Sequence, residues 1–340
     1  MSLSPQQAGD ADQVSSIAPE SGEGESWVAR NQTILIAAGL IVLLLIISGI
    51  RQPGFLSYGN LRQQLVLAAF LGTIAAGQTV VILTGGIDLS VAWNLNFAAI
   101  LFTQSIDGSG NPGRILLGTV LALLAATAVG TVNGLGVAYL RIPSLVMTLG
   151  VNTVMLGVAL VYTNGSPQGL APSFARELAT GRIGGQLPWA LVFWAVLSLL
   201  VIVMLKRSTF GRRIYAIGNN PRATYLSGIQ VRRSLVGVYA FAGLTAGMGG
   251  ILLAGYSSNT YLGMGDAYVL QSIAAVVIGG TSILGGSGTY AGTIIGAIMI
   301  VLLQNALQVV GIEPAGQQIL YGLIILLMLF IYGRSAKVRE

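Results

Sequence analysis

The stretch LTGGIDLSVAWNLN, from Leu83 to Asn96, separates two long apolar runs of the chain. A glycine pair lets the backbone bend and expose its carbonyls, and an aspartate follows in an otherwise apolar setting. The flanking runs come close to the ~20 residues that a helix needs to cross a bilayer core. The stretch is therefore typical of a bend between membrane helices, where irregular backbone is tolerated if it lines a cavity.

The composition of the whole chain supports a membrane protein. Of its 340 residues 54% are hydrophobic and only 8% charged, whereas about a quarter of the residues in a soluble domain are charged. The apolar residues form long segments without strand-like alternation, so helices and not a barrel are expected to span the membrane. The predicted fold class is an all-α integral membrane protein, a polytopic bundle of about ten transmembrane helices.

Ten apolar runs lie between charges and Gly/Pro breaks, and each is a candidate helix. They cover residues 33–50, 62–83, 89–106, 115–139, 144–163, 189–205, 234–255, 269–284, 289–310 and 317–332. The third and eighth runs are short and border Gly-rich sequence, so one or both are candidates for broken or re-entrant helices.

The ionisable residues exclude several classes of function. The chain has no cysteine and no histidine, which removes the usual thiolate and imidazole metal ligands and the commonest acid-base side chain. An enzyme is therefore not expected. The net charge of +6 is carried by residues at the ends of apolar runs and not by a patch interleaved with aromatics, so nucleic acid is not an expected partner.

Charge also predicts the domain organisation and the orientation. Residues 1–30 hold five acids and one base and are expected to form a disordered acidic cytoplasmic tail, followed by a transmembrane domain over 31–334 and a short basic C-terminus over 335–340. No cleavable signal peptide is recognised, so the first run should remain as a membrane helix. With both ends cytoplasmic, twelve Lys and Arg lie inside and five outside. This bias predicts a multi-pass protein of the inner membrane with both termini cytoplasmic.

Asp88 is the main candidate for a functional side chain. A carboxylate kept at membrane depth is a functional-site hypothesis by default, but its depth does not follow from the sequence. Capping of the helix that begins near Leu89 is favoured over direct contact with a solute, and the two roles can coexist. The polar groups nearby suit a polyhydroxylated solute, and the candidate pathway residues are Gln78, Asp88, Ser90, Trp93 and Asn94. Trp93 is a candidate for stacking on a sugar ring, although an interfacial anchor is the commoner role.

The polar segment 164–188 is predicted to face outward and to cap a vestibule or meet a partner, with a plain connector the favoured alternative. The inward loop 206–233 carries seven of the seventeen basic residues. Within it Pro221 is placed to start a short helix and Gly228 to stop it, which suggests a docking device. The chain contains no phosphate-binding G-x-x-x-x-G-K-[ST] loop, so any nucleotide that powers it must bind another chain.

Glycine occurs 47 times, and three pairs have the GxxxG spacing that lets membrane helices approach closely: Gly130 with Gly134, Gly243 with Gly247, and Gly292 with Gly296. A second glycine-rich stretch, VVIGGTSILGGSG over 276–288, weakly echoes VVILTGGIDLS over 80–90.

Three stretches together resemble the membrane permease subunits of ABC importers for simple sugars, of the ribose, xylose, galactose and arabinose type. They are LTGGIDLSV (83–91), GRRIYAIGNNPRATYLSGI (211–229) and AAVVIGGTSILGGSGTYAGTIIGA (274–297), and they occur in the family's order. The resemblance covers roughly residues 30–333.

The resemblance implies a dimeric pore, homodimeric or heterodimeric, with two cytoplasmic ATPase subunits and a periplasmic or extracellular solute-binding protein. ATP and Mg would be bound by the ATPase and no cofactor by this chain. By position, the segment that couples to the ATPase is carried onto Asn219, Asn220, Pro221, Arg222, Ala223, Thr224, Leu226, Ser227 and Gly228. The glycines expected to be structural within the two signatures are Gly85, Gly86, Gly279, Gly280, Gly285 and Gly286.

The expected function is a permease subunit for a monosaccharide or similar neutral solute, in contact with membrane lipid and coupled to a separate ATPase. An ABC permease for nucleosides or amino acids is an alternative, but a charged solute would favour a further intramembrane charge. An ion-coupled secondary transporter that uses Asp88 is another alternative, although it would have no need for a coupling helix.

Overall fold

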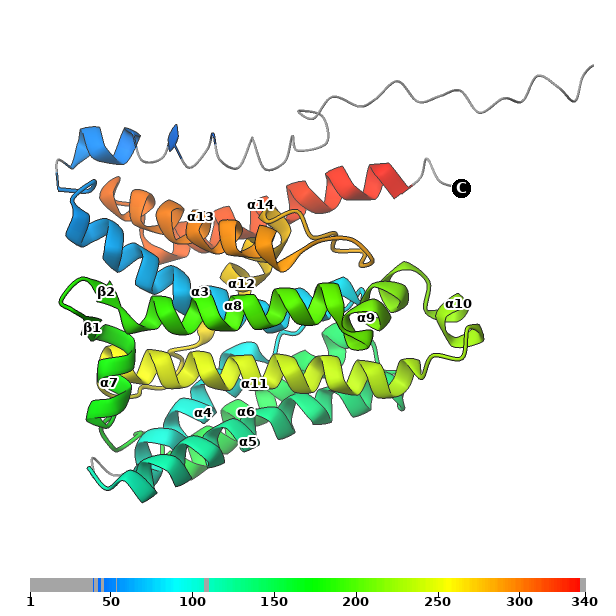
Figure 1. Ribbon diagram of the computed structural model, residues 1–340, viewed down its shortest axis with the longest axis horizontal. Coiled ribbons are helices and arrows are strands. Elements are labelled where there is room, and N and C mark those ends of the chain that lie inside the picture. Colours follow the sequence, from blue (N-terminus) through cyan, green and yellow to red (C-terminus); the bar gives the residue numbers. More distant parts are fainter. Residues whose placement is uncertain (1–38, 40–41, 44–45, 53, 107–109, 337–340) are drawn as a thin grey trace, which may run out of the picture.

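The computed structural model of the chain describes residues 39, 42–43, 46–52, 54–106 and 110–336 (Figure 1). The acidic tail predicted for residues 1–30 and most of the first apolar run lie outside the described residues, as do residues 337–340 of the predicted C-terminal segment.

The described chain is a bundle of helices. The apolar helices are α3 (Tyr58–Leu83), α4 (Val91–Ile106), α5 (Pro112–Ala138), α6 (Ser144–Thr163), α8 (Trp189–Arg207), α11 (Val231–Ser257), α12 (Asp266–Ile278), α13 (Tyr290–Val309) and α14 (Pro314–Ala336). Shorter elements connect them, namely α7 (Ser173–Thr180), β1 (Arg182–Ile183), β2 (Leu187–Pro188), α9 (Thr209–Asn219) and α10 (Pro221–Leu226).

Within the described residues, six helices are long and apolar enough to cross a membrane: α3, α5, α6, α8, α11 and α13. A helical membrane fold is therefore confirmed, while the number of about ten spans stays a prediction. The two runs expected to be short are short, since α4 has 16 residues and α12 has 13.

The eighth run was predicted to be helical to residue 284, and this is wrong. Helix α12 ends at Ile278, where Gly280 takes a φ of +84° and the N–H of Thr281 donates back to the carbonyl of Val276. A glycine in the left-handed region with this backbone bond is a common C-terminal stop of a helix. Residues 279–289 form a loop instead.

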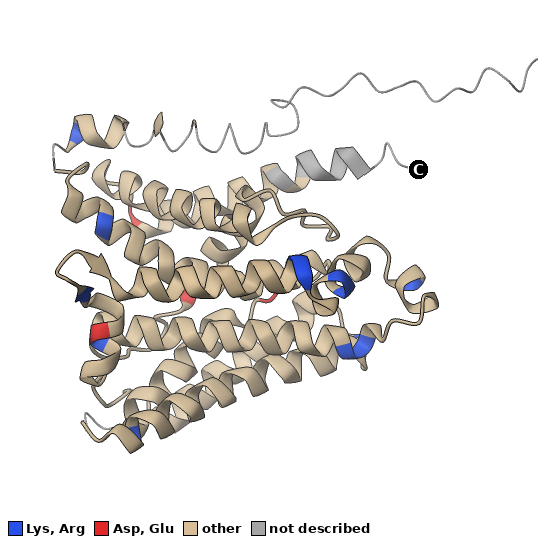
Figure 2. Cartoon of the chain, in the orientation of Figure 1, with Lys and Arg blue, Asp and Glu red and all other residues tan. Residues whose placement is uncertain are grey.

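The elements gather at two opposite ends of the bundle (Figure 1). Helices α9 and α10 lie at one end, and α7 with the β1–β2 hairpin lies at the other. Lysines and arginines crowd the α9/α10 end (Figure 2). The described acids outside the bundle interior, Glu177, Asp266 and Glu313, flank helix ends on the α7 side. The segregation of basic residues agrees with the positive-inside pattern of the sequence.

Helices α3 and α4 are the most deeply buried helices of the bundle. Twelve of the sixteen residues of α4 are buried, and α4 packs against α5, α6 and α11. Its burial on all sides explains how a short helix with two asparagines is accommodated, since a helix surrounded by protein need not match the bilayer thickness.

Helices α5 and α11 meet through their predicted glycine pairs. A Cβ on Gly130 would lie 3.0 Å from the Cα of Gly243, and a Cβ on Gly247 would lie 2.7 Å from the Cβ of Ala126. These separations leave no room for side chains, so the two backbones are in contact. The pair on α13 is used in the same way, because a Cβ on Gly292 or on Gly296 would overlap the backbone of α12. All three GxxxG pairs are packing sites, as predicted.

Segment 164–188 is more structured than a plain connector. It contains α7 and the β1–β2 hairpin, and α7 packs on α11 where the carbonyl of Ala175 meets Gly255. The favoured prediction of a solvated loop was therefore wrong for its second half. The buried residues Ala175 and Ala179 lie one helical turn apart on one face of α7. The helix has only eight residues and its buried face is formed by alanines, so it was not recognised as a separate element in the sequence.

Candidate functional site

Asp88 lies in a bend, Thr84–Ser90, between the end of α3 and the start of α4. Its carboxylate is 1% exposed, and Oδ1 accepts from the Ser90 N–H at 2.8 Å and from the Ser90 hydroxyl at 2.6 Å. Helix α4 begins at Val91 and not at Leu89, and Ser90, whose carbonyl accepts from Asn94 N–H, stands at its N-cap position. Asp88 therefore closes an Asx turn onto Ser90 just ahead of α4. None of the hydrogen bonds described for Asp88 comes from an N–H of the helix itself, and the capping role stays a prediction.

The bend is fastened to α6 by three polar side chains that the sequence analysis missed. The Ser144 hydroxyl accepts from Ile87 N–H at 3.3 Å, and the Thr148 hydroxyl accepts from Leu89 N–H at 3.0 Å. One turn further, the Asn152 side-chain oxygen accepts from Trp93 N–H at 3.2 Å. A detectable signal was present, because Ser144, Thr148 and Asn152 recur every four residues and so form one polar stripe on an otherwise apolar helix. We call these three residues the α6 ladder.

The α6 ladder also gives the depth of Asp88. Ser144 is the first residue of α6, which begins at the α9/α10 end. The bend therefore lies in the part of the bundle toward that end, and not near the middle of a span.

Two further helices close around the bend. The Asn133 amide on α5 donates to the Ser90 hydroxyl at 2.7 Å. The absence of a side chain on Gly86 makes room for Tyr239 of α11, whose hydroxyl oxygen would lie 2.5 Å from a Cβ there. Asp88, Ser90 and Asn133 thus form one chain of hydrogen bonds at the junction of α4, α5 and α11.

The other predicted pathway residues are also inside the subunit. Gln78 is fully buried on α3, and neither of its amide atoms has a hydrogen-bond partner among the described residues. Asn94 donates to the carbonyl of Ala126 at 3.1 Å, and its side-chain oxygen has no partner in the same part of the chain. Trp93 of α4 is 8% exposed and packs toward α6 in a cluster with Met155. A solute reaches these groups only if the surrounding helices move.

A second polar region lies between α3, α12 and α13, toward the α7 end. It is a pocket of about 130 Å³ with an uncharged lining, in which amide groups predominate. The polar lining residues are Tyr268, Gln271, Gln304, Asn305 and Gln308. We call it the amide pocket. Sequence reasoning missed it, although Gln304 and Gln308 stand one helical turn apart in an apolar run and so share a face.

Helix α10 has the boundaries that its sequence predicts. Pro221 is its first residue, and the Asn220 side chain caps it by accepting from Ala223 N–H at 2.9 Å. Gly228 follows with a φ of +81°, and its N–H donates to the carbonyl of Tyr225 at 3.0 Å. Within α10 only Thr224 is buried. The helix therefore projects from the bundle with most of its surface free.

The predicted coupling residues therefore lie together at one end. Those on the exposed surface are Asn219, Asn220, Pro221, Arg222, Ala223, Leu226, Ser227 and Gly228. Helix α9, which precedes them, was not predicted. A sequence signal for α9 was present, because Ser208, a residue type common at helix N-caps, precedes apolar residues on one face of an otherwise basic segment. In the structure the Ser208 hydroxyl accepts from Gly211 N–H at 3.0 Å.

The far end of α9 touches both glycine-rich signatures. Gly218 of α9 lies against the carbonyl of Leu83 and against Gly286, where a Cβ would overlap both. The Tyr215 hydroxyl donates to the carbonyl of Gly288 at 2.9 Å. Partial burial raises the pKa of Tyr215 above its usual value, so the hydroxyl stays protonated and remains a donor. Helix α9 is thus in direct contact with loop 279–289 and with Leu83, the residue that precedes the Asp88 bend.

The signature glycines make this contact possible. Gly85 and Gly285 both have positive φ, and a Cβ on Gly285 would lie 2.7 Å from the Gly85 nitrogen. The two bends therefore touch through backbone atoms alone. Gly279 similarly abuts Gly292 of α13, which places the end of α12 against the start of α13.

Comparisons with known proteins agree with this architecture. A family profile described as "Branched-chain amino acid transport system / permease component" matches residues 60–329. The ribose import permease protein RbsC of Bacillus subtilis is 35% identical over 86% of this chain and 90% of its own length. RbsC of Escherichia coli K12 is 34% identical over 92% and 96%, and the galactose/methyl galactoside import permease protein MglC of Haemophilus influenzae 33% over 91% and 96%.

No solved structure matches the chain. The family match spans most of the sequence and includes all three stretches on which the resemblance to sugar-importer permeases was based. The chain therefore belongs to the family of branched-chain amino acid transport system permease components, multi-pass membrane proteins that include import permeases for sugars.

Proposed function

We propose that the chain is the membrane-spanning subunit of an ATP-driven importer and that it carries a monosaccharide or a similar small, neutral, polyhydroxylated solute. The observation that carries the proposal is α10, a capped helix with one buried residue, joined through α9 to the bend that holds Asp88. A projecting helix of this kind suits docking into a groove of a separate ATPase. Closure of the ATPase would then move α9 and both glycine-rich bends as one unit.

The chemistry of the interior favours a neutral solute. Asp88 is the one buried carboxylate among the described residues, and its Oδ1 already accepts two hydrogen bonds from Ser90. Most of the buried polar side chains with an unpartnered atom in the described residues are amides, and the others are hydroxyls. Both kinds of group donate and accept hydrogen bonds and so match the hydroxyls of a sugar. The printed names of the relatives, ribose and galactose import permeases, support this class of solute.

An amino acid is the second candidate, because the family description names branched-chain amino acid transport. A zwitterion would need one group of each charge along its path, or else it would lose hydration without replacement. The described interior offers Asp88 alone, and it faces Ser90. The sugar is therefore preferred. An ion-coupled mechanism is not favoured, since it gives α10 no role.

The remaining partners follow from the same proposal. The α9/α10 end faces the cytoplasm of a bacterial cell, with both termini on that side, and ATP with Mg binds the ATPase. The α7 end faces the solute-binding protein, to which it presents exposed apolar residues including Leu170, Phe174 and Leu187. A second permease subunit completes the pore.

The proposal is tested by purifying the tagged full chain from its native host in mild detergent and identifying co-purifying proteins by mass spectrometry. We expect an ATP-binding-cassette protein, and we expect Leu226→Asp on α10 to reduce its recovery at least tenfold. Leu226 is 78% exposed, so the substitution should not disturb the bundle. The matched control is Leu170→Asp, at a residue that is 61% exposed at the other end. A stable preparation with no ATPase, or equal recovery with both variants, contradicts the proposal.

The solute is tested separately by uptake of labelled ribose, galactose and leucine into cells with and without the gene. Uptake of leucine but of neither sugar would overturn the proposed solute class while leaving the ATPase coupling intact.

A further inference from the structure

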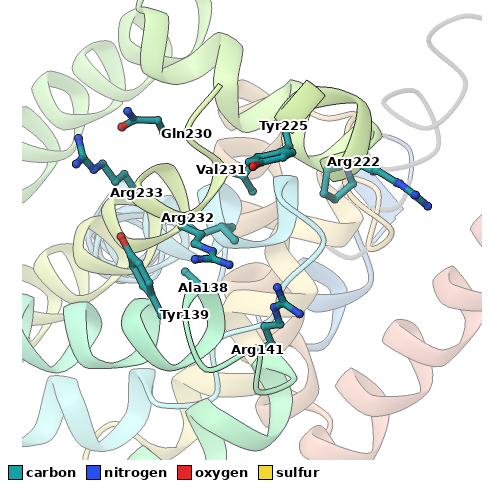
Figure 3. A pocket seen from close by; sticks show the side chains of 11 residues that line it. Ala138, Tyr139, Arg141, Arg222, Tyr225, Gln230, Val231, Arg232 and Arg233 are labelled. Carbon is teal, nitrogen blue, oxygen red and sulfur yellow. The ribbon is translucent and has the colours of Figure 1, made fainter. Parts of the chain in front are cut away.

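A cavity with a basic lining lies where α5, α10 and α11 meet at the α9/α10 end. Its volume is about 900 Å³, and four arginines line it: Arg141, Arg222, Arg232 and Arg233. They come from three separate parts of the fold, namely the turn after α5, helix α10 and the first turn of α11. The positive-inside rule accounts for arginines at this end of the bundle. Arg222 and Arg233 extend away from the cavity in opposite directions, so Arg141 and Arg232 are the two arginines that face it (Figure 3).

The cavity contains no internal counter-charge. None of its lining residues is acidic, and within the described residues no carboxylate forms an ion pair with these arginines. Figure 3 shows the side chains of Arg141 and Arg232 turned toward the same space. Arg232 also lies over the ring of Tyr139, with its guanidinium carbon 5.6 Å from the ring centroid. This contact holds Arg232 in place without neutralising it.

The backbone adds to the positive field. Helix α11 begins at Val231 in the cavity wall, and its N-cap residue Gln230 makes no side-chain cap hydrogen bond. The first N–H groups of a long helix together act as about half a positive charge. Arg141 is held at a φ of +57°, a conformation that non-glycine residues adopt at a cost of about 1–2 kcal/mol. The arginines and the N-terminus of α11 together favour the binding of an anion in this cavity.

The surface beside the cavity is apolar. On α5, Val132, Leu135 and Tyr139 are spaced by three and four residues and so form one stripe, and each is between 45% and 49% exposed. The stripe runs from the cavity along a helix that is long and apolar enough to span the membrane, of which only a small part is buried. A ligand with a charged head in the cavity could therefore lay its hydrocarbon chains along α5.

From this geometry we infer that the cavity is a binding site for the phosphate headgroup of an anionic membrane lipid such as phosphatidylglycerol, with its acyl chains on the α5 stripe. One arginine guanidinium can bind a phosphate group through two parallel hydrogen bonds. Basic pockets between helix ends are a known form of lipid recognition. The lipid would link α10 to the ends of α5 and α11 without covering the outer face of α10. The site does not depend on which solute is carried.

The experiment uses the full chain in mild detergent, with phosphatidylglycerol or phosphatidylcholine of identical acyl chains added at equal concentration. Native mass spectrometry then counts the lipids retained per protein. We expect phosphatidylglycerol to be retained at least ten times more than phosphatidylcholine. Arg141→Gln with Arg232→Gln should remove most of this preference. Arg176→Gln with Arg182→Gln, two exposed arginines at the α7 end, should leave it unchanged.

A conservative variant separates charge from fold. Arg141→Lys with Arg232→Lys keeps both charges, and it should retain phosphatidylglycerol at an intermediate level because lysine binds phosphate as a point charge. If the Gln variant fails to elute as a monodisperse peak, the Lys variant decides, and retention equal to that of phosphatidylcholine overturns the inference.

Three other outcomes would also overturn it. Equal retention of the two lipids by the unchanged chain excludes a headgroup site. Displacement of the lipid by glycerol 3-phosphate at equimolar concentration would identify a soluble phosphate ester as the ligand. Loss of ATPase co-purification in the Gln variant with lipid retention intact would identify the cavity as a protein-docking surface.

Discussion

The backbone N–H of Gly286 donates to the carbonyl oxygen of Leu83 at 2.9 Å, which joins the two glycine-rich signatures of the chain directly. Leu83 is the last residue of α3, and Gly286 lies in the loop between α12 and α13. Because Gly218 of α9 packs on both, three segments that are distant in sequence share one point. A displacement of α9 must therefore be felt in both bends, which is the physical basis of the proposed coupling.

The orientation of the bundle can be tested because the chain contains no cysteine, so that a single introduced thiol is the only site of labelling. Ser166 and Ser227 are exposed at opposite ends of the bundle. We expect Ser166→Cys to react with a membrane-impermeant maleimide on intact spheroplasts, and Ser227→Cys to react only after permeabilisation. The reverse pattern would invert the topology.

Replacement of Asp88 tests whether its carboxylate stabilises the local turn or binds an ion. Asp88→Asn keeps a side-chain oxygen for the Ser90 N–H, so we expect most of the stability and of the uptake to remain. Asp88→Ala leaves buried donors without a partner, at a cost of about 1–3 kcal/mol, and should lower the melting temperature by several degrees. Thermal unfolding in detergent and solute uptake are the measurements. Full stability of Asp88→Asn with abolished uptake would instead favour ion coupling.

The α6 ladder can be tested on two threonines of the same helix. The Thr148 hydroxyl accepts from Leu89 N–H in the bend, whereas the hydroxyl of exposed Thr153 donates only to the carbonyl of Leu149 in its own helix. Thr148→Val should therefore cost about 1–2 kcal/mol, and Thr153→Val should cost almost nothing. Thermal unfolding of the two variants checks the difference, and equal melting temperatures would show that the ladder does not stabilise the bend.

The contact between α5 and α11 should not tolerate a side chain. A Cβ at Gly243 would overlap the carbonyl of Ala126, so Gly243→Leu must push the two helices apart at a cost of at least about 3 kcal/mol. Gly150 on exposed α6 has nothing within 4 Å of a Cβ, which makes Gly150→Leu the matched control. Size-exclusion profiles after heating measure the folded fraction. The prediction is wrong if both variants survive equally.

The stop of α10 can be changed without any clash. Gly228 and Gly165 both have positive φ, at +81° and +77°, and neither has an atom within 4 Å of a Cβ. Valine is strongly disfavoured in this region of backbone space, so each variant strains only its own turn. We expect Gly228→Val to reduce solute uptake per ATP hydrolysed at least fivefold in the reconstituted importer, and Gly165→Val to leave the ratio unchanged. A similar ratio for the two variants would show that the α10 turn does not act in coupling.

Local rules predicted those features of the fold that depend on neighbouring residues. Pro221 begins α10 because the fixed φ angle of proline suits the first turn of a helix, and Gly228 follows its end because glycine readily adopts the left-handed conformation. The GxxxG pairs were likewise found from spacing alone. The early end of α12 could have been predicted from Gly279 and Gly280, because a glycine in the left-handed region is a common helix stop. The predicted helix passed over them because the apolar residues Ile283 and Leu284 follow.

The polar network was less accessible to sequence reasoning because it depends on which helices meet. The position of Gln78 in the C-terminal part of α3 is readable from the chain, but the burial of its amide without a partner among the described residues follows only from packing. Asn133 is one polar residue among many until α5 brings it to Ser90. Asp88 could be identified as a candidate from the sequence, because a carboxylate next to a membrane-spanning apolar run carries a free-energy cost.

The attachment of α10 through a single buried residue, Thr224, separates two kinds of evolutionary change. Substitutions on its exposed residues alter the shape and charge offered to another protein while leaving the core unchanged. Substitutions at the glycine contacts behind it alter the bundle and are tolerated at none of these close approaches. If α10 docks on a separate ATPase as proposed, the surface that contacts the ATPase and the core that surrounds the solute pathway can therefore change independently of each other.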